Sequence, residues 1–242
     1  MAHVMVPFTN GKGGVGKTAL ACSYAAARAQ EGADVILADT NDEQRTALAW
    51  SAVRAHNAIL PKVRVEAASP REALEMLGRC DILVVDTPGW TDRSTLQLAR
   101  KSTFMVIPTG PNPTFELAET VKLLHGLSAE GIDLWRLGIV LSRFSAEEKI
   151  RSDEEALARA YLADAGYKAL EGCIRNSPIY GSALAEGYGL TEVERGQGLA
   201  QEAQAAMHSI SKGVSAAHQR IARMEREVAK DRDRGRDGGR GR

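Results

Sequence analysis

Near its N-terminus the chain reads Gly11-Lys12-Gly13-Gly14-Val15-Gly16-Lys17-Thr18, between a strand-like run and a helix-like run. This stretch fits the pattern G-x-x-x-x-G-K-[ST], in which glycines let backbone N–H groups converge on phosphates without Cβ clashes. The N-terminus of the following helix adds a favourable dipole end. We therefore expect all eight residues to bind a nucleotide. Lys17 is expected to contact the β- and γ-phosphates of ATP, and the Thr18 hydroxyl to bind Mg²⁺.

Outward from this loop, buried strand patterns alternate with helix patterns. A helix is expected over Lys17–Glu31, and short apolar runs predict strands at His3–Phe8, Asp34–Asp39, Asp81–Asp86, Phe104–Ile107 and Leu137–Leu141. Such alternation predicts an α/β fold, a mostly parallel sheet with helices on both faces, as in P-loop NTPases. Because Pro7 lacks an N–H, the first strand is expected to be bulged or shortened there.

Two serines predict helix starts. Ser69 and Glu72 form a capping-box pattern around Pro70, which suits the first helical position. Ser152 and Glu155 repeat the capping-box pattern before a helix that should end near Gly166.

A second acidic group is needed beside the loop to hold the metal. Asp86 ends the apolar strand and begins Asp86-Thr87-Pro88-Gly89. The carboxyl ends of parallel strands meet at the edge where α/β folds bind ligands, so Asp86 is expected near Thr18 and Mg²⁺.

Bulk composition limits the partners. The 242 residues contain 31 Lys plus Arg and 31 Asp plus Glu, so attraction to nucleic acid must come from local clustering. The cysteines Cys22, Cys80 and Cys173 are odd in number and lack C-x-x-C spacing, which favours reduced thiols in the cytoplasm. No apolar run is long enough to span a bilayer.

The C-terminal region has a different pattern. Apolar residues recur at alternating spacings of four and three at Ala203, Met207, Ile210, Val214, Ala217, Ile221, Met224 and Val228. We favour a terminal helix packed on the domain, with a helix for partner binding or self-association as the alternative. The expected organisation is a P-loop ATPase domain over 1–197, a C-terminal helix over 198–229 and a disordered basic-acidic tail over 230–242.

Two lysines in one phosphate loop point to a particular family. The string Asn10–Thr18, with Lys12 as the early lysine, resembles the ParA/MinD family of deviant Walker A (P-loop) ATPases, in its ParA-like partition and positioning branch. The sequence at Asp86 resembles the metal-binding motif of that family. Asp39–Thr46, followed by Trp50, resembles its switch I, although Glu43 stands where the family usually has Pro and one residue is extra.

The resemblance implies an ATP-dependent sandwich homodimer in which Lys12 reaches the partner's ATP. It implies catalytic roles for Lys12, Lys17 and Asp42, with Asp42 orienting the attacking water. Thr18, Asp86 and Asp39 would hold Mg²⁺, although the extra residue leaves open whether Asp39 or Asp42 positions the water. Hydrolysis would be slow until a partner stimulates it.

The resemblance also implies non-specific DNA binding, a ParB-like or cargo-adaptor activator and a cytoplasmic, nucleoid-associated protein. Arg143, Arg151 and Arg175 are the expected DNA-binding residues of the folded domain, and the arginine-rich tail is the alternative DNA site. Ser142-Arg143 stands where relatives often carry Asn-Arg at the adenine, so base recognition stays open.

Three functions are therefore considered. The first is a ParA-like ATPase for plasmid or chromosome partition or for cargo positioning. The second is a conjugation-associated ATPase of the same family. The third is an ATP-dependent biosynthetic enzyme of the same fold, which the sequence favours less because it shows no additional catalytic Cys/His/Asp set. A membrane role would need apolar residues in the tail, and the tail from Lys230 has none.

Overall fold

The computed structural model describes residues 3–88 and 93–237. Within this part of the chain, seven parallel strands form one sheet in the order β3-β2-β4-β1-β5-β6-β7. The strands are β1 (Val4–Phe8), β2 (Val35–Asp39), β3 (Arg64–Ala67), β4 (Ile82–Asp86), β5 (Met105–Thr109), β6 (Leu137–Phe144) and β7 (Ala169–Arg175).

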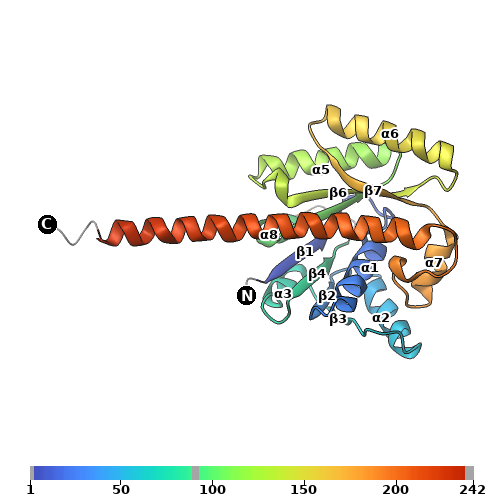
Figure 1. Cartoon of the computed structure of the whole chain (residues 1–242), viewed down its shortest axis with the longest axis horizontal. Helices are drawn as coiled ribbons and strands as arrows, with labels where there is room; N and C mark the ends of the chain where they lie inside the picture. The colour runs from blue at the N-terminus through green and yellow to red at the C-terminus, as the bar shows by residue number, and fades with distance from the viewer. Residues whose placement is uncertain (1–2, 89–92, 238–242) are drawn as a thin grey trace.

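Helices cover both faces of this sheet (Figure 1). One buried core is shared by α1 (Lys17–Gln30), α2 (Thr46–His56), α7 (Pro178–Ala185) and α8 (Leu199–Asp237). The other core is shared by α3 (Pro70–Glu75), α4 (Arg93–Lys101), α5 (Ala118–Ala129) and α6 (Glu148–Asp164). Short turns η1 (Pro113–Leu117), η2 (Leu134–Arg136) and η3 (Leu190–Glu192) complete the connections. The predicted α/β class with helices on both faces is confirmed.

The strands predicted from apolar runs are present, and most of their bounds agree within one or two residues. β2 is buried throughout, as expected for a strand covered on both faces. Two strands were missed, β3 and β7. β3 is an edge strand with no fully buried residue, and β7 carries Glu171 and Gly172, so neither shows an apolar run.

Pro7 shortens one side of β1 without bulging the other. The pairing with β4 is unbroken through Pro7 and Val85. On the β5 side the registered pairing is limited to Phe8 and Val106, and the neighbouring Met5 N–H donates to the Thr103 hydroxyl instead. The missing N–H therefore lies on the β5 side, where shortening is tolerated.

The two predicted capping boxes have different outcomes. Ser69 accepts from the Glu72 N–H and Glu72 accepts from the Ser69 N–H, which confirms the first. The second is wrong, because α6 begins at Glu148 and both Ser152 and Glu155 lie inside it. The N-cap residue of α6 is Glu147, whose side chain makes no capping bond, and Ser145 lies two residues before it. The Ser145 hydroxyl accepts from the Glu147 N–H, and the Ser145 N–H donates to Glu154.

The C-terminal helix changes its environment along its length. From Ala203 to Ala217 the apolar stripe is buried in the core shared with α1. Beyond this the helix leaves the body of the molecule (Figure 1), and Met224 and Val228 are about half exposed. The helix reaches Asp237, past the expected end at residue 229, and the rest of the expected tail, 238–242, lies outside the described residues.

Candidate nucleotide and metal site

The phosphate loop connects β1 to α1 at the carboxyl edge of the sheet. Gly14 and Gly16 adopt positive φ values of 77° and 93°, which side chains rarely tolerate. A Cβ on Gly16 would also lie 2.9 Å from the Ser142 hydroxyl. The N-cap residue of α1 is Gly16, which has no side chain to cap the helix, and this favours binding of an anion by its first N–H groups. Local geometry thus matches the predicted phosphate cradle.

The two lysines of the loop have different surroundings. Lys17 is 8% exposed, and its ammonium group donates a 3.0 Å hydrogen bond to the Lys12 carbonyl oxygen. Burial lowers the pKa of Lys17, and the nearby carboxylate of Asp86 opposes this shift. The Lys12 side chain is exposed, and no group among the described residues pairs with it. One cation therefore lies within the loop and the other faces solvent.

Asn10 fixes the base of the loop, a role that the sequence did not reveal. Its buried side-chain amide donates to the Pro108 carbonyl at 2.7 Å and to the Thr120 hydroxyl at 2.9 Å. Its side-chain oxygen accepts from the Lys12 N–H. These bonds join the loop to β5 and α5. A buried amide that uses both its donor and its acceptor holds the backbone in one position.

The acid predicted to hold the metal lies beside the loop. The Thr18 hydroxyl donates a 2.7 Å hydrogen bond to Oδ2 of Asp86, which is 1% exposed. Burial, together with the nearby charge of Asp39, raises the pKa of Asp86 to about 7, although the Thr18 hydrogen bond and the Lys17 charge oppose this shift. The other carboxylate oxygen, Oδ1, is buried and has no hydrogen-bond partner among the described residues.

These groups fit a Mg²⁺ ion. A buried oxygen without a partner, beside a threonine hydroxyl, presents the hard oxygen ligands that Mg²⁺ prefers. Among the described residues no cluster of three or more His, Cys, Asp or Glu side chains could enclose a metal. A site of few protein ligands suits an ion that keeps waters and shares phosphate oxygens.

Asp39 lies next to Asp86 in the sheet but has a different set of contacts. The two residues are register partners at the ends of β2 and β4. The Asp39 carboxylate is buried, and its oxygens accept from the backbone N–H groups of Asn41 and Leu48, each at 3.1 Å. It therefore holds the start of α2 and the preceding loop in place. Its predicted metal role would be an addition to this anchoring.

The predicted water-positioning residue Asp42 lies in the loop before α2. Its side chain is 72% exposed and pairs with Arg45, three residues further on. Asp42 lines a cavity of about 560 Å³ together with Gly13, Lys17, Thr18 and Thr87. The structure thus places Asp42 on the wall of the same cavity as the phosphate loop.

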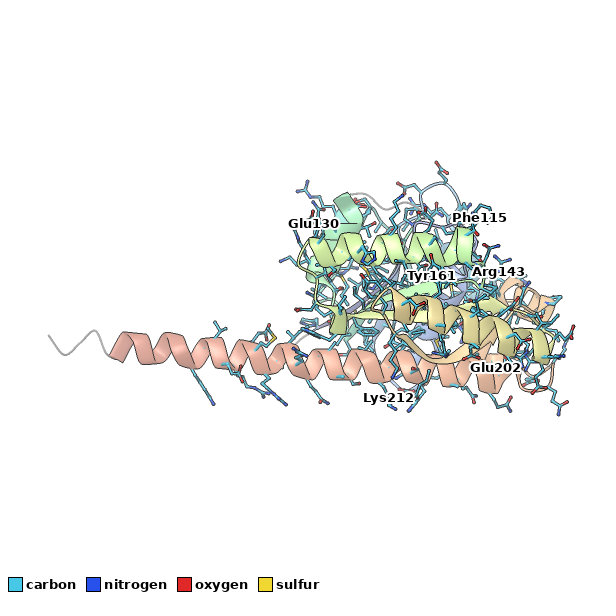
Figure 2. All side chains as sticks on the ribbon, turned by 90° about the horizontal axis from the view of Figure 1, so that it is seen from above. Phe115, Glu130, Arg143, Tyr161, Glu202 and Lys212 are labelled. Carbon is cyan, nitrogen blue, oxygen red and sulfur yellow. The ribbon has the colours of Figure 1, made fainter. Side chains whose placement is uncertain are left out.

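The three arginines predicted to bind DNA each contact protein groups. Arg143, at φ 65°, donates to the Gly14 carbonyl and so lies against the phosphate loop. Arg151 donates to the carbonyls of Ser145 and Ala146. Arg175 pairs with Glu202. Figure 2 labels Glu202 near the start of α8. Arg143 is therefore held against the phosphate loop, and the charge of Arg175 is paired with a carboxylate.

These features define a class: an α/β nucleotide-binding domain with a phosphate loop and a buried acid beside it at the carboxyl edge of a parallel sheet. The profile of the CobQ/CobB/MinD/ParA nucleotide binding domain family matches residues 6–188, and the chain belongs to this family. The resemblance read from Lys12 and its neighbours is thereby confirmed.

Three individual relatives are similar to this chain in sequence or in structure. The chain is 33% identical over 192 residues to the maintenance of carboxysome distribution protein A of Gloeobacter kilaueensis, covering 78% of this chain and 84% of that protein. The septum site-determining protein MinD of Pyrococcus horikoshii, solved with Mg-ADP, has a TM-score of 0.69 at 16% identity, covering 89% of this chain and 98% of that one. A ParA family ATPase from Chlorobium tepidum has a TM-score of 0.65 at 18% identity, covering 86% and 100%. The two structures show a shared fold.

No helix in residues 3–88 or 93–237 has both the length and the apolar content needed to cross a membrane.

Proposed function

We propose that this protein is a ParA-like positioning ATPase. It binds ATP with Mg²⁺, forms an ATP-dependent sandwich dimer and binds DNA without sequence preference while it is a dimer. A ParB-like or cargo-adaptor protein stimulates its slow hydrolysis, and it acts in the cytoplasm on the nucleoid. The printed name of the Gloeobacter relative concerns carboxysome distribution, which supports the positioning of a cargo as the general role.

The single observation that carries this proposal is the difference in burial between Lys12 and Lys17. Lys17 is buried in the loop, where it would contact the phosphates of the ATP bound to the same copy. Lys12 is exposed at the rim with an unpaired ammonium group among the described residues. A cation that faces outward can neutralise the phosphates of a second copy, and it does so only when the two copies meet.

The residues of the site divide the work of hydrolysis. The loop N–H groups and Lys17 bind and orient the phosphates. Asp42 orients the attacking water, and Asp86 with Thr18 holds the metal, which supplies charge neutralisation at the phosphates when bound. Asp39 keeps the Asp42 loop in register with the strand ends. Lys12 of the partner copy completes the positive surroundings.

The deciding experiment is binding to random duplex DNA with ATP and Mg²⁺, with ADP, and without nucleotide. We expect binding only with ATP, and a steep loss between about 50 and about 200 mM salt, because phosphate contacts release counterions. Equal binding in all three states, or none with ATP, would contradict the proposal. The latter result would favour small-molecule chemistry on the same fold.

A further inference from the structure

The segment from the end of α7 through η3 packs against both α1 and α2. A Cβ on Gly187, at φ 86°, would lie 2.5 Å from the backbone nitrogen of Arg54 in α2. A Cβ on Gly189 would lie 3.2 Å from the Ser23 Cα in α1. The backbone of residues 186–192, which we call the clasp segment, therefore touches both helices where only glycine fits without displacement.

A buried arginine ties this segment to α2. Arg54 is 1% exposed, and its guanidinium donates to Glu192 through two nitrogens, at 2.7 and 2.8 Å. It also donates to the carbonyls of Gly187 and Pro61, each at 3.0 Å, and lies over the ring of Trp50. This ion pair is bidentate and almost fully buried. Such a pair is strong and fixes the relative orientation of its two side chains.

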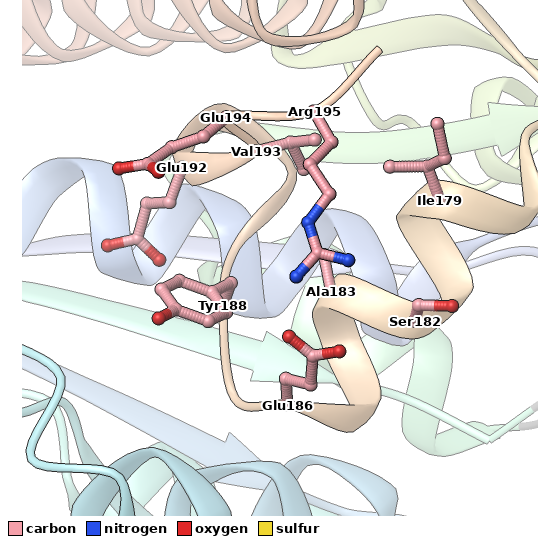
Figure 3. Close-up of a pocket in the computed structure, with 9 residues that line it drawn as sticks. All are labelled: Ile179, Ser182, Ala183, Glu186, Tyr188, Glu192, Val193, Glu194 and Arg195. Atoms are coloured by element: carbon pink, nitrogen blue, oxygen red, sulfur yellow. The ribbon is translucent and has the colours of Figure 1, made fainter.

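Glu192 also bonds to α1. The Gln30 amide near the end of α1 donates to Oε1 of Glu192 at 2.7 Å, and the Ser23 hydroxyl accepts from the Leu190 N–H at 2.8 Å. On the α2 side, the Trp50 indole donates to the Tyr188 carbonyl at 3.1 Å. The Glu192 carboxylate thus bridges the two helices. Figure 3 shows Glu192 and Tyr188 together on the clasp segment, beside a small pocket of about 110 Å³.

The two bridged helices carry the two halves of the nucleotide cavity. α1 begins at Lys17 of the phosphate loop, and α2 begins at Thr46, directly after the loop that contains Asp42. A rotation of α2 against α1 would shift the start of α2, and with it the loop that carries Asp42, relative to the phosphate loop. A misplacement of about 1 Å can cost on the order of 100-fold in rate.

We propose that Glu192 is a positioning residue for ATP hydrolysis. By receiving Arg54 from α2 and Gln30 from α1, it sets the position of the Asp42 loop relative to the phosphate loop. This inference rests on the proposed ATPase function. It adds a contact outside the nucleotide cavity on which the rate of hydrolysis depends.

The test compares Glu192→Gln with a matched control, Glu155→Gln. Arg159 donates to Glu155 at 2.9 Å and to the carbonyls of Leu170 and Gly172, so it joins a helix to neighbouring backbone much as Arg54 does. It joins α6 to β7, however, and touches neither α1 nor α2. In Glu192→Gln an amide N–H₂ replaces one carboxylate oxygen and opposes the donors of Arg54 and Gln30.

We expect Glu192→Gln to bind a non-hydrolysable ATP analogue as the unaltered protein does, but to turn over ATP about 10-fold more slowly. Hydrogen exchange supplies the second readout. Amides of residues 40–48 should gain protection on analogue binding in the unaltered protein and in Glu155→Gln, and should lose most of that gain in Glu192→Gln. Gln30→Ala, which removes only the α1 arm, should shift both readouts in the same direction by less.

Normal turnover and normal protection in Glu192→Gln overturn the inference, as does an equal loss in Glu155→Gln. If Glu192→Gln does not fold, the same criteria apply to Gln30→Ala. Failure of the proposed function is separate: it would appear as absent DNA binding or absent turnover in the unaltered protein. The protection experiment needs neither of these and still decides the inference.

Discussion

The Thr18 hydroxyl donates a 2.7 Å hydrogen bond to a carboxylate of Asp86 that is almost completely buried, 68 residues further along the chain. The second oxygen of that carboxylate has no hydrogen-bond partner within residues 3–88 and 93–237. The charge of this buried carboxylate is therefore stabilised poorly, and this has a measurable consequence in solution.

Asp86 should make the metal-free protein less stable as pH rises. Burial raises the pKa of Asp86 to about 7 from an ordinary value of 3.8. Between these values the folded state holds a proton that the unfolded chain has lost. The stabilisation is complete below about pH 4 and is lost as pH rises through about 7, with an upper limit on the order of 4 kcal/mol.

Urea unfolding with chelator, without nucleotide, checks this in the unaltered protein and in Asp86→Asn, which cannot titrate. Relative to that of Asp86→Asn, the free energy of unfolding of the unaltered protein should decrease from pH 5 to pH 8. Parallel pH profiles would show that Asp86 is ionised throughout.

Substitution of the two loop lysines should affect different properties of the protein. Lys17→Ala should abolish nucleotide binding, because it removes the phosphate cation and the bond to the Lys12 carbonyl. Lys12→Ala keeps that carbonyl and should bind ATP while remaining monomeric. Light scattering in an Asp42→Ala background, with ATP and Mg²⁺, measures the dimer. Normal dimerisation of the Lys12→Ala protein would refute a role across the interface.

Asp42→Ala should bind ATP close to normally and hydrolyse it at least about 100-fold more slowly, because the attacking water loses its orienting group. Glu43→Ala is the matched control, since Glu43 is the neighbouring acid on the same cavity wall. Steady-state phosphate release compares the two. Similar rates in both would move the role to Asp39 or elsewhere.

DNA binding should respond to the partner of Arg175. Arg175→Glu should weaken ATP-dependent binding more than truncation after Arg226. Glu202→Gln should strengthen it, because the Arg175 guanidinium loses its bidentate carboxylate. Glu227→Gln makes the same charge change further along α8 and serves as the control. A stronger effect of Glu227→Gln in a mobility-shift titration would indicate that the tail is the DNA site.

Substitutions in the buried and in the exposed part of the apolar stripe of α8 should differ in their effect on the free energy of unfolding. Ile210 is fully buried, so Ile210→Ala should lower the free energy of unfolding by about 2–5 kcal/mol. Met224 is 49% exposed, and Met224→Ala should change it by no more than about 0.5 kcal/mol. Urea denaturation of both variants tests this. Equal losses would mean that Met224 is covered in solution, for instance by another copy of the helix.

Much of the fold could be predicted because its signals are local. The apolar runs before Asp39 and Asp86 predict buried strands whatever surrounds them, and the glycines of the phosphate loop require a particular backbone at that point. The strands β3 and β7 could not be found in this way. They are held by pairing with one neighbour at a sheet edge, and their own residues show no periodic signal.

The local sequence alone determined the nucleotide loop, its two lysines and an acid, Asp86, at the end of an apolar strand; that this acid lies near Thr18 followed from the expected parallel sheet. The local sequence also placed α8, but not the point where its apolar stripe loses its cover. Tertiary structure alone decided that Arg175 is bound to Glu202, that Asp39 anchors the start of α2, and that Arg54 and Gln30 meet at Glu192. The physical reason is the distance along the chain. A buried ion pair between residues 138 positions apart depends on which helices pack together, and no spacing within the sequence encodes that contact.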